Sequence, residues 1–196
     1  MILIYKGGFP MKKETSIGID TPSGGKVALL LIDIQNDYFE NGTNALHNPL
    51  DALNNGEKIL QYFRDENLEI IHVQHLNNPG STLFVEGSWG AEIHEDLTPL
   101  DNETIITKKQ ISSFAGTNLE DVLREKDISY LIISGMQSNV CVEGTTKSAH
   151  AIGFNITVLE DACAAKDQAT HERAMKLLSD EYATVISTEE FLRGNG

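Results

Sequence analysis

Three residues that could together activate a nucleophile follow apolar segments at widely separated points of the chain. Asp33 lies near the end of the apolar run 27–34, Lys108 closes the segment 103–109, and Cys141 follows the run 130–136. A cysteine attacks as its thiolate, and a lysine ammonium group or a helix N-terminus beside it lowers the pKa of the thiol. A carboxylate within hydrogen-bond reach can take the thiol proton and return it to a leaving group. Together these groups would transfer an acyl group to cysteine and then hydrolyse the product.

Each of these residues also has an ordinary structural interpretation. A single cysteine is most often a small buried hydrophobic residue. Asp33 could be a structural cap, and Lys108 could be a solvated lysine at the end of a strand. Cys163 keeps the structural interpretation, because no second chemical group accompanies it. The catalytic hypothesis therefore requires a fold that brings the three residues to one place.

The apolar runs predict such a fold. Six segments rich in Ile, Val and Leu are typical of strands, namely 27–34, 69–76, 103–109, 130–136, 155–161 and 182–188. Helical patterns lie between them at 51–67, 116–127, 140–153 and 169–182. Continuous apolar strands alternating with helices predict an α/β protein, with a three-layer α/β/α Rossmann-like fold and a mainly parallel six-stranded sheet. Ligands of such folds bind beyond the carboxyl ends of the strands, where all three candidate residues would lie.

Two segments fall outside this alternation. Residues 1–24 are expected to form a loosely attached N-terminal arm, and residues 25–196 a single domain. The segment 78–99 is too long for a simple connection, so we expect it to form a pocket wall or a lid.

Composition excludes several classes of protein. The chain has 15 Lys and Arg against 29 Asp and Glu, a formal net charge of −14, which disfavours nucleic acid and anionic membrane surfaces as partners. Two cysteines do not make a disulfide framework or a zinc cluster. No apolar stretch approaches the length of a transmembrane helix, and the N-terminus lacks the pattern of a signal peptide. We therefore expect a cytoplasmic protein.

Four segments together carry a resemblance to a known superfamily: LLLIDIQNDYF, TKKQISSFAGTNLEDVL, LIISGMQSNVCVEGTTKSAHAIGF and ITVLEDACAA. The chain resembles the isochorismatase-like cysteine hydrolases, which include nicotinamidases and other amide hydrolases. The resemblance implies a catalytic triad of Asp33, Lys108 and Cys141. It also implies a cis peptide between Met136 and Gln137, with the N–H groups of Gln137 and Cys141 forming an oxyanion hole.

The resemblance further implies hydrolysis of the C–N bond of a small-molecule amide through a thioester, without a cofactor, in a homodimer or homotetramer. Nicotinamidases typically carry a metal-binding D-x-H motif followed by another histidine. Here the matching region reads Val73-Gln74-His75, and the next histidine is His94, so we predict no metal. His72 lies in mid-strand and is expected to be structural. The alternatives are a metal-dependent nicotinamidase and a non-catalytic binding protein. A thiol redox protein is disfavoured, because there is no C-x-x-C motif.

Substrate-binding residues are predicted from the segments that should surround the triad. Aromatic walls suit a small planar or apolar substrate, and Phe39, Trp89 and Phe114 are the candidates, with His75 beside them. Trp89, between glycines in GSWGAE, is the predicted lid residue.

Overall fold

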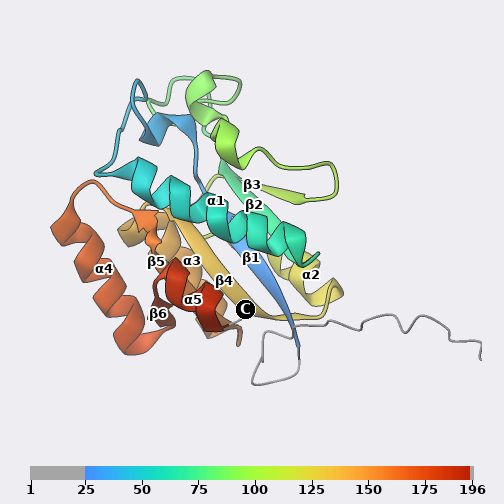
Figure 1. The fold of residues 1–196 in the computed structure, drawn as a ribbon. Helices are drawn as coiled ribbons and strands as arrows, with labels where there is room; N and C mark the ends of the chain where they lie inside the picture. The colour runs from blue at the N-terminus through green and yellow to red at the C-terminus, as the bar shows by residue number, and fades with distance from the viewer. Residues whose placement is uncertain (1–24, 195–196) are drawn as a thin grey trace, which may run out of the picture.

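A six-stranded parallel sheet forms the centre of the protein in the computed structural model, which describes residues 25–194 (Figure 1). The predicted arm, residues 1–24, lies outside the described residues. Along the sheet the strands follow the order β3-β2-β1-β4-β5-β6, and every neighbouring pair is parallel. The strands are β1 (Lys26–Ile32), β2 (Glu69–His75), β3 (Thr104–Lys108), β4 (Ile128–Met136), β5 (Asn155–Ala164) and β6 (Thr184–Ile186). The predicted α/β class and sheet are confirmed.

Helices cover both faces of the sheet, which gives the three layers seen in Figure 1. One face carries α1 (Pro49–Asp65) and α5 (Thr188–Gly194). The other carries α2 (Leu119–Glu125), α3 (Glu143–Ala151) and α4 (Gln168–Glu181). The sequence did not predict α5, which is short. The helix predicted over 140–153 is shorter in the structure, where α3 begins at Glu143 after a π-helical turn at Ser138–Val142.

Strand β1 shows why the sheet is buried on both sides. Its alternate side chains point to opposite faces, as a period of two requires. One set, Val27, Leu29 and Leu31, packs with α1 and α5, and the other set, Ala28, Leu30 and Ile32, packs with α2, α3 and α4. Full burial of a leucine contributes ~1.5–3 kcal/mol, so this strand anchors both cores.

Helix α1 begins where the sequence supplies the right residues. Asn48 has a φ of 46°, in the left-handed region that asparagine tolerates, and Pro49 occupies the first helical position. The buried residues of α1 recur at spacings of three and four, which is the period of an amphipathic helix; they are Ala52, Leu53, Gly56, Ile59, Leu60 and Phe63.

His72, in the middle of β2, is structural, as expected. Its Nε2 lies 2.8 Å from Oε2 of Glu103, and Arg64 donates to the same carboxylate at 2.6 and 3.0 Å. These donors hold the pKa of Glu103 at about 2 against the opposing effect of burial. The ion pair connects α1 to the outer strands of the sheet.

The order of the strands determines where the site lies. The chain runs outward from β1 to β3 and then crosses back to place β4 against the other side of β1. Loops therefore diverge at the carboxyl ends of β1 and β4, which is the position where open α/β sheets bind ligands. Asp33 follows β1, and the turn that carries Cys141 follows β4.

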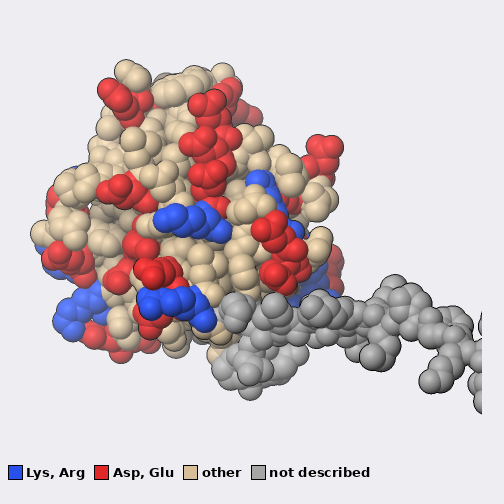
Figure 2. All heavy atoms as spheres, in the orientation of Figure 1, with Lys and Arg blue, Asp and Glu red and all other residues tan. Residues whose placement is uncertain are grey.

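Acidic side chains surround the fewer basic ones on the face shown in Figure 2. This agrees with the formal charge of −14. Among the described residues, none of the helices has the length and apolar character needed to cross a membrane.

Candidate active site

Asp33 stands in a tight turn directly after β1. Its φ of 53° lies in the left-handed region, which aspartate tolerates better than most residues. The N–H of Asp33 donates to the carbonyl of Val73 at 2.9 Å, and its own carbonyl accepts from the N–H of Gln35 at 2.9 Å. These bonds fix a fully buried carboxylate at the carboxyl edge of the sheet.

Lys108, the last residue of β3, places its ammonium group at the centre of the site. Nζ lies 2.8 Å from Oδ2 of Asp33, in an ion pair with no exposed atoms. It donates to the carbonyl of Gln110 at 2.9 Å and to Nδ1 of His75 at 3.0 Å, and it lies 3.3 Å from Sγ of Cys141. The three residues that the sequence placed at separate strand ends are therefore in mutual contact.

The turn that carries Cys141 begins at the end of β4. The peptide bond between Met136 and Gln137 is cis, and a π-helical turn, Ser138–Val142, follows it. The carbonyl of Gln137 accepts the N–H of Val142 at 3.2 Å, which is the i to i+5 bond of this turn. Such turns often mark functional sites. This one delivers Cys141, which is 4% exposed, to Lys108.

Gly135, one residue before the cis bond, has to be a glycine. Its φ of 151° is one that side chains rarely adopt, and an added Cβ would collide with the backbone of Ile32 in β1. Strands β1 and β4 can therefore approach closely at the edge where Asp33 and Cys141 meet.

The pKa of the Cys141 thiol is shifted in the direction opposite to the one expected from the sequence. The pKa of Cys141 is raised to about 12, first by burial and then by the Asp33 carboxylate, while Lys108 only partly offsets both. Burial likewise raises the pKa of Asp33 against the opposing charge of Lys108. The expected lowering is wrong because it counted the ammonium group and the helix end but neither burial nor the adjacent carboxylate. A thiol with so high a pKa is protonated at neutral pH.

The segment 78–99 is held in place by the residues that follow Asp33. The side chain of Gln35 donates to the carbonyl of Ala91 at 2.6 Å and also forms a pair of hydrogen bonds with the backbone of His75, at 2.8 and 2.9 Å. Asn36 donates to the carbonyl of Trp89 at 2.9 Å. The segment is thus tied to the ends of β1 and β2.

Asp37 completes this attachment. One carboxylate oxygen accepts the N–H of Phe84 at 2.6 Å, and the other accepts the N–H of Thr43 at 3.1 Å. Gly90 packs on the same carboxylate so closely that a Cβ there would collide with it. These attachments fix the segment 78–99 next to the turn that carries Asp33; its role as a pocket wall or a lid stays a prediction.

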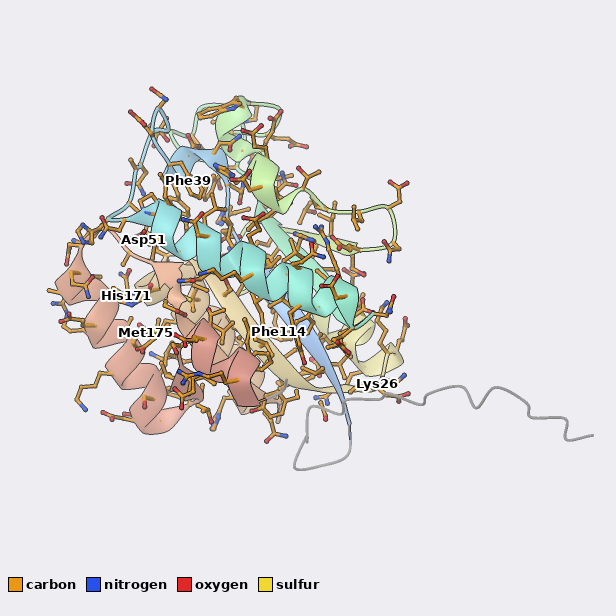
Figure 3. All side chains as sticks on the ribbon, viewed as in Figure 1. Lys26, Phe39, Asp51, Phe114, His171 and Met175 are labelled. Atoms are coloured by element: carbon orange, nitrogen blue, oxygen red, sulfur yellow. The ribbon has the colours of Figure 1, made fainter. Side chains whose placement is uncertain are left out.

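The predicted substrate-binding aromatic residues occupy different environments. Phe39 is buried, and its ring lies 4.4 Å from that of His94, beyond the N-terminal half of α1 (Figure 3). Phe114 is partly buried and packs on Phe154 at 6.1 Å. Trp89 is 53% exposed, which suits a residue at an entrance. Substrate binding by these residues stays a prediction.

Tyr38, which the sequence did not single out, lies closer to the chemistry than its neighbour Phe39. Burial and the nearby charges of Asp33 and Cys141 raise the pKa of its phenol, and a hydrogen bond with Gln137 opposes them. Its ring packs edge-on against Phe84 at 4.8 Å. Tyr38 therefore stays protonated and can act as a hydrogen-bond donor. The 3-10 turn that contains it has no sequence periodicity from which this orientation could be read.

Asp33, His75 and Cys141 each offer an atom that could ligate a metal, and these atoms lie within 4.8 Å of one another. The ammonium group of Lys108, however, contacts all three, at 2.8, 3.0 and 3.3 Å. A metal ion here would have to displace Lys108, so these residues do not fit a metal site. Independence from metal stays a prediction for this chain.

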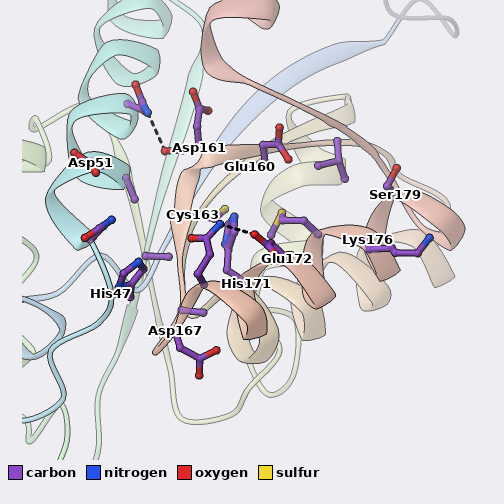
Figure 4. A pocket seen from close by; sticks show the side chains of 18 residues that line it. His47, Asp51, Glu160, Asp161, Cys163, Asp167, His171, Glu172, Lys176 and Ser179 are labelled. Atoms are coloured by element: carbon purple, nitrogen blue, oxygen red, sulfur yellow. Dashed lines mark hydrogen bonds between the residues drawn. The ribbon is translucent and has the colours of Figure 1, made fainter.

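A separate cavity of about 650 Å³ opens between the start of α1, the end of β5 and α4 (Figure 4). The triad is not among the residues that line it, whereas Cys163 and His171 are. Burial raises the pKa of Cys163 to about 12, in keeping with its structural interpretation. His171 reaches the active site indirectly, because its Nδ1 lies 2.8 Å from Oγ of Ser138 at the start of the Cys141 turn.

Comparison with known proteins shows the family of this chain. The model of the isochorismatase domain matches residues 27–190. This chain belongs to the isochorismatase family. The isochorismatase family protein YddQ of Bacillus subtilis is 40% identical over 177 residues, covering 85% of this chain and 98% of its own.

Solved structures of isochorismatase-family proteins share the fold. A protein from Oleispira antarctica assigned to the isochorismatase hydrolases superposes with a TM-score of 0.84 at 35% identity, covering 90% of this chain and all of its own. N-carbamoylsarcosine amidase from Thermoplasma acidophilum gives a TM-score of 0.76 at 25% identity, covering 83% of this chain and 96% of its own. The chain is therefore an isochorismatase-family hydrolase, and its substrate has to be argued from the site.

Proposed function

We propose that this protein is a metal-independent cysteine hydrolase that cleaves the C–N bond of a small-molecule amide through a thioester. The contact of one ammonium group with both a buried carboxylate and a buried thiol carries the proposal. Such a group can stabilise negative charge on either partner while one proton passes between them. The similarity to an enzyme named as an amidase supports amide chemistry.

The first half of the reaction forms the thioester. Asp33 accepts the proton of Cys141 as the sulfur attacks the amide carbon, and Lys108 stabilises the developing thiolate. The amide N–H groups of Gln137 and Cys141 are assigned to the oxyanion of the tetrahedral intermediate. Protonated Asp33 then donates to the departing amine, so that the C–N bond breaks as the leaving group becomes neutral.

The second half releases the acid. A water molecule takes the place of the amine, and Asp33 removes its proton as the oxygen attacks the thioester carbon. The same oxyanion site holds the second tetrahedral intermediate, and its collapse breaks the C–S bond. Asp33 returns a proton to Cys141, which restores the resting thiol that the raised pKa favours.

The proposal is tested by measuring ammonia release from a panel of small primary amides, nicotinamide included, with and without a chelator. Cys141→Ala should abolish release, whereas Cys163→Ala, which removes the other buried thiol, should leave it within a few-fold of the parent. Release that survives the chelator supports the metal-independent mechanism.

Two outcomes contradict the proposal. Loss of activity with the chelator, restored by zinc, iron or manganese, would favour a metal-dependent nicotinamidase. Release that persists in Cys141→Ala would show that the thiol is not the nucleophile.

A further inference from the structure

Lys108 faces more acceptors than it has protons to give. An ammonium group carries three N–H donors. Among the described residues, four acceptor atoms lie within 3.3 Å of Nζ, and they belong to Asp33, Gln110, His75 and Cys141. Sulfur is the most distant of the four and, as a thiol, the weakest acceptor. In the resting state Asp33, Gln110 and His75 therefore receive the three hydrogen bonds.

Transfer of the proton changes the balance between two of these acceptors. When the proton moves from Cys141 to Asp33, the thiolate becomes a strong acceptor and the carboxylic acid a weak one. One N–H of Lys108 can then turn from Oδ2 of Asp33 to Sγ of Cys141. The hydrogen bonds from Lys108 to Gln110 and His75 need not change, so they hold the ammonium group in place while its third N–H changes acceptor.

The contact with His75 is possible in only one state of the imidazole ring. Because Lys108 can only donate, Nδ1 of His75 must carry a lone pair, and the proton of the neutral ring must sit on Nε2. Nε2 lies 3.2 Å from Oδ1 of Asn77, which can accept that proton in a hydrogen bond. The amide nitrogen of Asn77 donates to the carbonyl of Leu83 at 2.9 Å, and this bond fixes the orientation of the Asn77 amide.

We propose that His75 is a positioning residue of the active site, which holds the Lys108 ammonium group through a neutral imidazole whose tautomer Asn77 fixes. The role deepens the proposed function and rests on it for its catalytic consequence. It also gives a different role to a residue that the sequence suggested for substrate binding. Protonation of His75 would remove the acceptor and place a second cation beside Lys108, so the neutral ring is the working form.

The titratable groups around the ring support this state. Lys108 faces it from β3, Asp33 from the turn after β1, and Cys141 from the turn after β4. Phe84, in the segment 78–99, places its uncharged ring 5.7 Å from the His75 ring. Burial and the Lys108 charge lower the pKa of His75, and Asp33 opposes them. His75 is therefore neutral at about pH 7.

Nitrogen-15 NMR of the histidine rings tests the arrangement without a substrate. His75, assigned by comparison with His75→Asn, should be neutral with its proton on Nε2 at about pH 7, and should titrate below the ordinary 6.5. In Lys108→Met the pKa of His75 should move upward, because the cation that helps to lower it has gone. His72, on the same strand but paired with Glu103, is the internal control and should not move. A proton on Nδ1, or a titration that Lys108→Met leaves unchanged, would overturn the proposal.

The catalytic consequence is tested on any amide that the parent protein hydrolyses. In His75→Asn the amide oxygen can still accept from Lys108 but cannot titrate, so kcat should stay within about tenfold and the fall of activity in acid should shift to lower pH. His75→Leu, which has no acceptor, should lose at least about a hundredfold in kcat.

The direction of the pH shift separates His75 from Asp33. If Asp33 alone set the acid limb, loss of the His75 charge would raise the Asp33 pKa and move the limb to higher pH. That direction, or equal activity of the two variants, would overturn the role in catalysis. If the NMR results hold but no amide is hydrolysed, the proposed function fails while the anchoring of Lys108 stands.

Discussion

Replacing Asp33 with asparagine separates the two charges that act on the Cys141 thiol. In the native protein the Asp33 carboxylate raises the thiol pKa, and Lys108 lowers it. Asparagine has nearly the same shape but no charge, and it leaves the ammonium group beside the sulfur. We therefore expect Asp33→Asn to abolish hydrolysis and yet to make the thiol more acidic.

The distance between the two groups sets the size of the effect. The ligand atoms of Asp33 and Cys141 lie within 4.8 Å of each other. Two unit charges at that separation interact by ~3.5 kcal/mol at an effective dielectric constant of about 20, which corresponds to ~2.5 pKa units. A more acidic thiol is also a weaker nucleophile, with a Brønsted coefficient of about 0.45, so alkylation should accelerate by ~25-fold at about pH 8.

The assay is the rate of alkylation of Cys141 by iodoacetamide, followed on its own peptide by mass spectrometry. Cys163, in the same digest, should react at the same rate in every variant, because it lies outside the triad. Lys108→Met should change the Cys141 rate in the opposite direction. Melting temperatures check that each variant is folded, since Lys108→Met leaves a buried carboxylate unpaired.

Slower alkylation in Asp33→Asn would refute the reasoning. It would mean that Asp33 already holds the proton in the native protein, so that the resting pair is a thiolate beside a carboxylic acid. Hydrolysis should fall by at least ~100-fold in either case, because general-base catalysis contributes ~10²–10⁴.

Three further predictions concern the supporting structure. The pKa of Glu103 is lowered in the folded protein from 4.5 to about 2, so its stabilisation is complete above pH 4.5 and disappears as the pH falls towards 2. Glu103→Gln should therefore lose ~3 kcal/mol of stability at neutral pH and flatten the stability curve across that interval, which urea unfolding at several pH values would reveal; an unchanged curve would contradict it. Gly90→Ala should destabilise the protein by ~1–3 kcal/mol, because the added Cβ would collide with Asp37. Gly56→Ala, where a Cβ makes only ordinary contacts, should instead stabilise α1 by ~0.5–1 kcal/mol. Equal melting temperatures of the two variants would contradict both expectations. Ser138→Ala should cost ~1 kcal/mol for the lost bond to His171 and slow turnover more than Ser138→Thr, and kinetics in which the two variants are equal would contradict this.

The sequence by itself determined the architecture and predicted that Asp33, Lys108 and Cys141 would lie together, as the structure shows. Continuous apolar runs indicate parallel strands, because a strand that helices cover on both faces has apolar side chains on both faces. Parallel strands end at a common edge, so residues at 33, 108 and 141 could be placed together without knowledge of any distance. These are local patterns, and each can be read within a single segment of the chain. Helix α5 was not predicted, because a helix of seven residues is too short to show a clear hydrophobic periodicity.

Only the tertiary structure decided what the assembled groups do to one another. The pKa of the Cys141 thiol depends on burial and on the Asp33 carboxylate, and both result from contacts between distant segments of the chain. The sequence alone therefore predicted the direction of the pKa shift wrongly. The choice between Tyr38 and Phe39 depends on the orientation of one short turn. The place of His75 beside Lys108 depends on the pairing of β2 with β3. Electrostatic and hydrogen-bond effects depend on distances of a few ångströms in space, and these distances cannot be read from the separation of two residues along the chain.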